Sequence, residues 1–255
     1  MAEAVSVIII AGGGDRHGLA RSQGVAHPSL VKIAGRSIIA GMVEAFWSAP
    51  GVAEVIVVSA PEVLAELPRE VGKVAAGGAA TENISRGLFK ASKDWVIIAP
   101  GDMPWLSGAA VSDFLAAAQA TGADLVYPIV SQQDYNARYP GGRRTYVTLR
   151  EGTYTGGNLV LARHSFLQDL LPLIHRLFEY RKNPLLLARV LGVGFVVKML
   201  LKRLEIRSIE QRARQLTGGR AVALPIARPE LAFDVDRPED LAAALALAAS
   251  GGMSA

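Results

Sequence analysis

Three aspartates carry the clearest chemistry in this chain. Asp102 follows an apolar run, and Asp234 and Asp236 form a second acidic pair separated by one residue. Residues two apart in an extended segment face the same side, so both carboxylates of this pair can point into one cleft. Mg²⁺ in proteins prefers a few carboxylates together with water and the phosphate oxygens of a nucleotide. We therefore expect a magnesium site formed by Asp102, Asp234 and Asp236.

Two of these acids also have a structural interpretation. Asp102 would serve as a turn former or as the N-cap of a helix. Asp236 opens the run Asp236-Arg237-Pro238-Glu239, in which an early proline and acids in the first turn are typical of a helix start. We expect Asp236 to act partly as a helix cap whether or not it binds a metal.

A glycine-rich turn near the N-terminus is the second candidate site. The β-branched run 5–10 leads directly into Ala11, Gly12, Gly13, Gly14, Asp15 and Arg16. Glycines allow a tight turn and bring backbone N–H groups close to a ligand with no Cβ in the way, and an arginine beside them can pair with a phosphate. A buried strand followed by a flexible turn accounts for the same residues, so this motif alone is weak evidence.

The elements that must position these residues alternate between strand and helix. The apolar runs 52–59, 95–99 and 124–129 predict strands, whereas 38–46 and 108–120 predict helices. This alternation is typical of an α/β fold with a mostly parallel central sheet flanked by helices. Ligands of such sheets bind outside the carboxyl ends of the strands, which is where both the glycine turn and Asp102 fall.

The second half of the chain is less regular. The segments 143–149 and 153–161 predict two paired strands, and 221–225 predicts an edge strand. Residues 165–219 are mostly helical in pattern and basic, since residues 176–220 hold eleven Lys and Arg against three Asp and Glu. We expect a single domain over the whole chain, 1–255, with 165–219 as a basic helical insertion.

Composition restricts the classes of function. The chain has 255 residues and is 51% hydrophobic, which suits one large domain with an ample core. It contains no cysteine, which excludes disulfides and Cys-based zinc sites. The N-terminus does not resemble a signal peptide, and we expect a cytoplasmic protein. Because the excess positive charge is confined to one segment, a protein that coats nucleic acid is not expected.

The segment 184–204 is strongly apolar with interspersed cations. A membrane span needs about 20 apolar residues with few charges, and Arg189 and Lys198 interrupt this run. Basic residues beside a broad apolar face suit an interfacial helix on an anionic membrane. A lid helix pair packed on the sheet and a contact in a homo-oligomer are the alternatives.

Four segments, taken together and in order, resemble the MobA-like nucleotidyltransferases. They are AGGGDR at 11–16, GRSII at 35–39, GDMP at 101–104 and DVDRPEDL at 234–241. This family has a GT-A-type, Rossmann-like fold and includes molybdenum-cofactor guanylyltransferases and sugar- and polyol-phosphate cytidylyltransferases. The resemblance implies that an NTP and a phosphorylated small-molecule acceptor react to give an NDP-linked product and pyrophosphate, with Mg²⁺ as cofactor.

The resemblance also implies roles for single residues. Asp102 matches the metal-binding aspartate, and Asp234 or Asp236 matches a second metal-facing position. The glycine turn would wrap the triphosphate, with Arg16 as its arginine. The implied contacts to the base and ribose are Gly78, Asn83 and Ser85. Asn158 resembles a residue of the strand that faces the acceptor, although a β-bulge explains it equally well, and Arg143 and Arg144 nearby suit an anionic acceptor.

One departure from the family pattern concerns a lysine that follows the glycine turn. Its position here is occupied by Pro28. Such a lysine neutralises charge on the α-phosphate, a contribution of about 3–4 kcal/mol per donor. In an active enzyme Lys32 or Arg21 would replace it, or the acceptor would bring a partner group, and we take Lys32 as the candidate. The alternatives are a nucleotide-binding protein with weakened or lost catalysis, and a peripheral membrane-binding module.

The four histidines, His17, His27, His164 and His175, are scattered and lack the spacing of metal ligands. A surface or capping role is the simpler interpretation of each. His17 and His27 lie in the predicted nucleotide loop, where a phosphate contact is the alternative.

Overall fold

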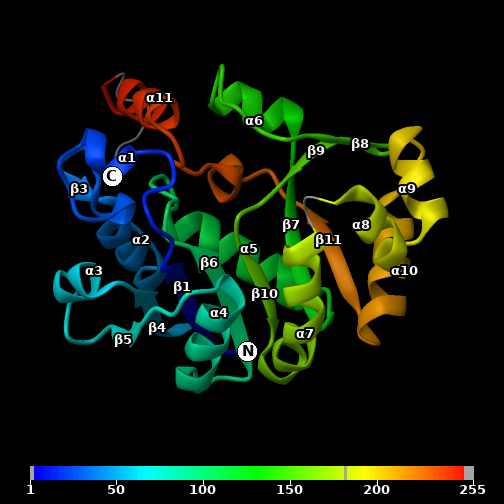
Figure 1. Ribbon diagram of the computed structural model, residues 1–255, viewed down its shortest axis with the longest axis horizontal. Helices are drawn as coiled ribbons and strands as arrows, with labels where there is room; N and C mark the ends of the chain where they lie inside the picture. The colour runs from blue at the N-terminus through cyan, green and yellow to red at the C-terminus, as the bar shows by residue number, and fades with distance from the viewer. Residues whose placement is uncertain (1–2, 181–182, 250–255) are drawn as a thin grey trace.

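The computed structural model describes residues 3–180 and 183–249 (Figure 1). Its centre is a nine-stranded mixed sheet within these residues. The strand order is β5 (Gly72–Ala75), β4 (Val52–Ser59), β1 (Val5–Ala11), β6 (Trp95–Pro100), β10 (Val160–Arg163), β7 (Leu125–Ser131), β9 (Gly152–Gly156) and β8 (Val147–Leu149), and β11 (Ala221–Pro225) also pairs with β7. β9 and β10 run against the other strands. The predicted α/β fold with a mostly parallel sheet is therefore confirmed.

The two faces of β1 pack into two separate clusters. Val5, Val7 and Ile9 join a large core with the helices α2 (Ile38–Trp47) and α5 (Gly108–Ala120). Ile8 joins a smaller core with the helices α4 (Ala80–Lys90) and α7 (His164–Tyr180) on the opposite face. Successive strand residues face opposite sides, so a strand covered on both faces is expected to be apolar on both. This explains the apolar runs of β1 and β6, in which the buried Ser6 is a polar exception that donates to Glu54.

The segment between β1 and α2 is a series of short elements. It holds α1 (Leu19–Ser22), the 3-10 helix η1 (Pro28–Leu30) and a small hairpin of β2 (Lys32–Ile33) and β3 (Arg36–Ser37). The hairpin turn consists of Ala34 and Gly35 with φ values of 51° and 82°, a conformation that closes two-residue hairpins. Ser37 lies at the N-cap position of α2 but makes no side-chain cap bond.

The other half of the sheet carries the remaining connections. They are α6 (Gln132–Arg138) after β7, the 3-10 helix η2 (Pro229–Ala232) and the loop that leads to α11 (Pro238–Ala249), whereas α3 (Pro61–Ala65) packs on β4 and β5 at the opposite edge and α11 itself contacts β2. The strand predicted over 143–149 is shorter, because only β8 (Val147–Leu149) pairs with β9. The preceding residues leave the sheet, and the side chain of Arg144 reaches toward Asp234 instead.

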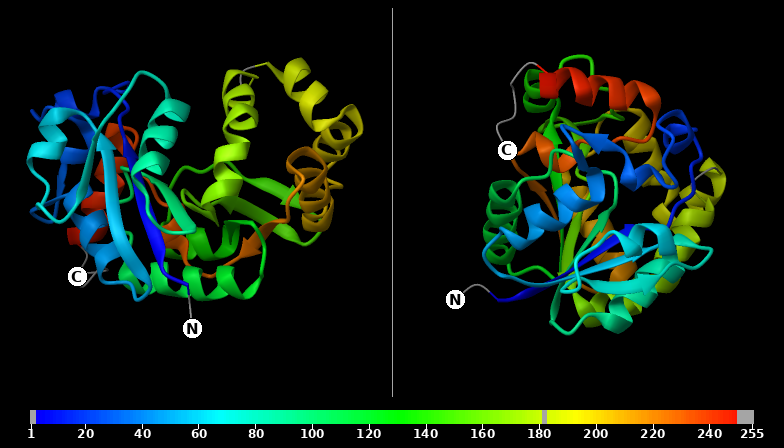
Figure 2. Two further views of the ribbon diagram at one scale, coloured as in Figure 1. Left: turned by 90° about the horizontal axis from the view of Figure 1, so that it is seen from below. Right: turned by 90° about the vertical axis from the view of Figure 1, so that its left-hand side faces the viewer.

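Residues 183–217, which we call the helical arm, form one end of the molecule (Figures 1 and 2). The arm consists of α8 (Pro184–Leu191), α9 (Val193–Leu200) and α10 (Ile206–Thr217). α7 precedes it and packs against α4 and β10. In the described part of the chain, none of the helices has the length and apolar character needed to cross a membrane.

Candidate active site

The glycine turn follows β1, next to the end of β6. The N–H of Gly101 donates to the carbonyl of Ile10 at 3.1 Å, which joins the two strand ends. A Cβ at Gly12 would lie 2.6 Å from Nδ2 of Asn83 and 2.7 Å from the Cβ of Ala76, so this position requires glycine. The space beside Gly13 and Gly14 is open, and both residues are exposed. The turn is thus packed at its first glycine and open at the next two.

A buried histidine holds the turn from one side. His27 is 7% exposed, and its Nδ1 accepts a hydrogen bond from the N–H of Ser29 at 3.1 Å. Nε2 therefore carries the proton and donates to the carbonyl of Gly13 at 2.7 Å. Burial lowers the pKa of His27 and favours this neutral form. These bonds assign His27 to the capping role expected for the histidines, at the start of η1.

Asn83 holds the turn from the other side. It is buried on α4, and its Oδ1 accepts from the N–H of Gly77 at 2.6 Å. Gly78 is exposed, and its N–H donates to Oε2 of Glu82 at 3.0 Å. Ser85 is exposed two residues further along the helix, which places it about 200° around the axis from Asn83. Of the three predicted base and ribose contacts, only Asn83 packs against the glycine turn.

The predicted cations lie on the surface around the turn. Arg16 and Lys32 are exposed, and neither forms an ion pair within the described residues. Arg21 is also exposed, on α1, where its N–H donates to Asp15 at 3.0 Å. Pro28 is the first residue of η1. The proposed replacement of the missing lysine by Lys32 or Arg21 remains a prediction.

The three aspartates meet beside the end of β6. Asp102 follows β6, whereas Asp234 and Asp236 lie between η2 and α11, and the N–H of Val235 donates to the carbonyl of Asp102 at 2.9 Å. One carboxylate oxygen from each aspartate lies within 4.8 Å of the other two. Sequence reasoning predicted this group, although its members come from distant parts of the chain.

The electrostatics of Asp102 fit a divalent cation. Its Oδ1 is fully buried and has no hydrogen-bond partner. Burial, together with the charges of Asp234 and Asp236, raises the pKa of Asp102 well above its usual range. A buried carboxylate oxygen without a donor favours either a proton or a cation beside it. Three carboxylates with open space for water and phosphate oxygens form a donor set that suits Mg²⁺, so the residues present fit this metal.

Arg144 is enclosed by protein partners. It forms an ion pair with Asp234, and its guanidinium donates to the carbonyl of Gly156 and to Oδ1 of Asn158, each at 3.0 Å. A fourth bond reaches Oγ1 of Thr155 at 3.2 Å. Burial raises the pKa of Asp234, and the Arg144 charge opposes this shift. Arg144 therefore partly neutralises the acid group, while Arg143 beside it is exposed.

A polar cavity of about 620 Å³ opens beside this cluster. Asn158 lies in its wall, and its side-chain amide acts on Asp234 to oppose the rise in the pKa of that carboxyl. The cavity brings the predicted Asn158, Arg143 and Arg144 together with Asp234 and Asp236. Gly156, beside Asn158 in the strand that the resemblance places at the acceptor, also lines it, together with residues that sequence reasoning missed: Tyr127, Thr145, Thr155, Arg237 and Asp240.

Arg237 and Asp240, two of the lining residues that were not predicted, belong to a segment that resembles the family pattern. Asp240 lies in the segment DVDRPEDL, and its carboxylate accepts from the N–H groups of Asp236 at 3.3 Å and Arg237 at 3.0 Å. The backbone at the start of α11 is therefore capped by Asp240, and the capping role expected of Asp236 was assigned to the wrong acid. Asp236 is left with an exposed carboxylate beside the cavity.

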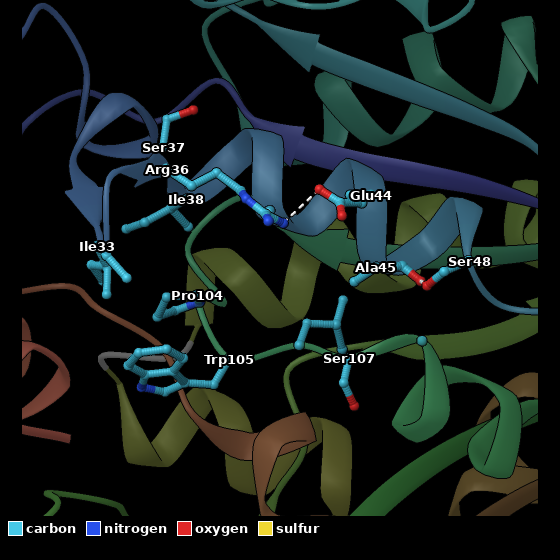
Figure 3. Close-up of a pocket in the computed structure, with 14 residues that line it drawn as sticks. Ile33, Arg36, Ser37, Ile38, Glu44, Ala45, Ser48, Pro104, Trp105 and Ser107 are labelled. Carbon is cyan, nitrogen blue, oxygen red and sulfur yellow. Dashed lines mark hydrogen bonds and ion pairs between the residues drawn. The ribbon is translucent and has the colours of Figure 1, made fainter. Parts of the chain in front are cut away.

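A second cavity, of about 310 Å³, lies between α2 and the segment 104–108 (Figure 3). Arg36 and Glu44 form an ion pair of 2.5 Å among its lining residues. Trp105 and Ser107 line it from the loop that follows Asp102. Its lining contains no residue of the three-aspartate group or of the glycine turn. We therefore assign the candidate site to the polar cavity beside Asp234 and Asp236.

Solved structures and family profiles include clear relatives of this arrangement. A hypothetical transferase from Thermus thermophilus is 38% identical, with 93% of this chain and 99% of that chain covered and a TM-score of 0.83. A CMP:2-keto-3-deoxy-manno-octonic acid synthetase solved with CTP is 16% identical, with 98% and 100% covered and a TM-score of 0.63. A 2-C-methyl-D-erythritol 4-phosphate cytidylyltransferase, also from Thermus thermophilus, is 21% identical, with 96% and 99% covered and a TM-score of 0.54.

The last two likenesses concern the fold alone, which is the expected GT-A-like nucleotidyltransferase fold. No curated protein matches the chain. The profile of the MobA-like NTP transferase domain matches residues 6–218, a range that includes the glycine turn and Asp102. By this match, and by its likeness to the hypothetical transferase of Thermus thermophilus, the chain belongs to the MobA-like NTP transferase family.

Proposed function

We propose that this protein transfers a nucleoside monophosphate from an NTP to a phosphorylated small molecule and releases pyrophosphate. The observation that carries the proposal is the group of three aspartates, whose buried Asp102 oxygen has no partner, at the strand ends beside the open glycine turn. A binding module would not need an unpaired carboxylate there, because burying one costs free energy.

The nucleotide would bind at the glycine turn. Gly13 and Gly14 offer open space beside their backbone, and Arg16 and Lys32 supply exposed cations for the triphosphate. Asp102, Asp234 and Asp236 would hold Mg²⁺, which supplies positive charge for the α- and β-phosphate oxygens. His27 and Asn83 would hold the turn in place without touching the ligand.

The acceptor would occupy the polar cavity. Arg143 and Arg237 are exposed cations in its lining. These groups suit an anionic molecule. The named neighbours act on a phosphorylated polyol and on a sugar acid, and both of these acceptors are anionic.

A phosphate group on the acceptor can itself act as the nucleophile. A phosphate oxygen of the acceptor attacks the α-phosphorus, a new P–O bond forms, and the bond to the β-phosphate breaks as pyrophosphate leaves with the electron pair. An ionised phosphate has no proton to lose, so this step requires no general base. Catalysis then depends on positioning and on charge neutralisation by Arg16 and Lys32.

The test is a screen of the four NTPs with and without Mg²⁺, beginning with CTP because of the neighbours named above. A ligand at 100 times its Kd adds about 2.7 kcal/mol of stability. We expect one NTP to raise the Tm only with Mg²⁺, and Asp102→Asn to abolish this shift. Asp169→Asn, which changes an exposed acid on α7, is the matched control and should leave it intact. Absence of any shift with every NTP would overturn the proposal.

One observation favours a second candidate, a nucleotide-binding protein with weakened catalysis. Pro28 occupies the lysine position of the family pattern and begins η1, where a side-chain cation is absent. This candidate predicts metal-dependent NTP binding without pyrophosphate release for any anionic acceptor. Pro28→Lys would then raise turnover, whereas in an active enzyme Lys32→Ala would lower it by about 100-fold.

A further inference from the structure

The helical arm exposes large apolar side chains at one place. Val197 is 47% exposed, Met199 39% and Leu201 59%. Val197 and Leu201 are four residues apart and thus share one face of α9 and its C-terminal turn. Contact of partly exposed apolar side chains with water is unfavourable, so this face is suited to contact with another apolar phase.

Cations surround this apolar face. Lys198 and Lys202 are also four residues apart, one position along from Val197 and Leu201, and Arg203 follows directly. All three are exposed, and none forms an ion pair within the described residues. We call residues 197–203 the α9 tip. The tip combines an apolar stripe with a parallel stripe of positive charge.

The backbone of the tip would favour glycine where the chain has lysine. Lys202 has φ of 54°, in the left-handed region that side chains disfavour. The N–H of Arg203 donates to the carbonyl of Lys198 at 2.8 Å, and that of Lys202 donates to Met199 at 3.0 Å. This is the helix-ending motif in which glycine normally takes the left-handed position. A lysine there costs stability and places a charge beside Leu201.

We propose that the α9 tip docks on the surface of an anionic phospholipid membrane. Apolar side chains flanked by lysine and arginine suit such a surface, because the stems enter the interface while the charges meet lipid phosphates. Two copies of a tip with three unpaired cations repel each other, which disfavours self-association. Nucleic acid would use the cations but would leave the apolar stripe in water.

The tip is attached to the side of the molecule that holds the polar cavity. The N–H of Arg150 donates to the carbonyl of Leu204 at 2.9 Å, and the N–H of Ile206 donates to Oε1 of Glu151 at 3.0 Å. Both contacts involve the turn between β8 and β9. β9 carries Thr155 and Gly156 of the cavity. Docking through the tip would therefore bring this side toward the membrane, whichever reaction the cavity performs.

The test is co-sedimentation of the full chain with vesicles of phosphatidylcholine alone or with one third phosphatidylglycerol. We expect binding only to the anionic vesicles, and weaker binding as salt is raised. Leu201→Glu should lower the partition coefficient by at least about tenfold. Leu245→Glu on α11 is the matched control, since Leu245 is 43% exposed outside the arm, and it should bind as the parent does.

Lys202→Gly separates the proposal from a folding defect. It removes one cation, which lowers binding by about fivefold, while glycine relieves the left-handed backbone and should raise the Tm. Lower binding with a higher Tm supports docking through the tip. The proposal is overturned by absence of binding to anionic vesicles at low salt, by equal losses for Leu201→Glu and Leu245→Glu, or by a concentration-dependent dimer that Leu201→Glu dissociates without vesicle binding.

Discussion

The N-terminal sheet and the helical arm use apolar residues in opposite ways. In the sheet, Val5, Val7 and Ile9 are fully buried between helices. In the arm, Leu204 is the only buried side chain among those that the structure describes. Both segments are rich in Val, Leu and Ile, so composition alone does not separate them. The difference is in how each segment is covered: α4 packs against β1 on one face and a core shared with α2 and α5 covers the other, whereas α9 packs mainly against α8.

This difference determines where each kind of site can lie. A metal site needs carboxylates held within a few ångströms, and Asp102 follows a strand that is fixed on both faces. A membrane contact needs only an accessible apolar face with cations, which a short, weakly buried helix provides. The sheet and the helical arm should therefore respond differently to substitution.

The largest difference is expected for truncation of apolar side chains. Phe114 on α5 is fully buried, and Phe114→Ala should lower the free energy of unfolding by about 3–5 kcal/mol. Leu201 is 59% exposed, and Leu201→Ala should change it by less than about 0.5 kcal/mol. Urea unfolding followed by circular dichroism measures both values. Similar losses for the two variants would mean that the arm is buried in solution.

A smaller effect is expected within the glycine turn. A Cβ at Gly12 would press on Asn83 and Ala76, so Gly12→Ala should cost about 1–3 kcal/mol and weaken NTP binding. Gly14→Ala has open space and should leave stability within about 0.5 kcal/mol of the parent. Urea midpoints for the two variants provide the measurement. Equal stability would show that the turn is not packed against α4.

Much of the fold could be predicted because its signals are local. The apolar run 95–99 and the capped segment 108–120 gave β6 and α5 within a residue of their observed bounds. The expected strand over 143–149 was too long, because its first half is directed by a contact between Arg144 and the distant Asp234. Likewise Ser37 occupies the N-cap position of α2, which suits a serine, but its side chain makes no cap bond. Local patterns do not contain such tertiary contacts.

Site residues could be predicted from the sequence only where the residue type itself indicates a chemical role. A carboxylate after a strand led to Asp102, and an acidic pair two residues apart led to Asp234 and Asp236, and the structure brings the three together. Tyr127 was missed because an exposed strand tyrosine has no distinctive spacing, and its place in the cavity depends on the pairing of β7 with β9. Ser85 was predicted as a contact of the nucleotide, but helix geometry turns it away from Asn83 on the same helix.

The pH dependence of stability tests the neutral form of His27, which holds the glycine turn. The pKa of His27 is lowered from its ordinary value of 6.5 by burial. The unfolded chain therefore takes up a proton at a higher pH than the folded one, and His27 contributes stability above pH 6.5 that is lost as pH falls through its folded pKa. We expect urea midpoints of the parent to fall relative to those of His27→Gln between pH 7 and 5. Parallel curves would contradict the assigned neutral form.

The smallest effect is expected at the junction between the arm and the sheet. Arg150 and Glu205 form an ion pair, with side chains 63% and 38% exposed. Exposed pairs contribute about 0–1 kcal/mol, and the backbone bond from Arg150 to Leu204 survives substitution. Arg150→Ala should leave the urea midpoint unchanged, while proteolysis within the arm becomes modestly faster, because local opening costs less than global unfolding. A loss of global stability above about 1 kcal/mol would show that arm and sheet unfold as one unit.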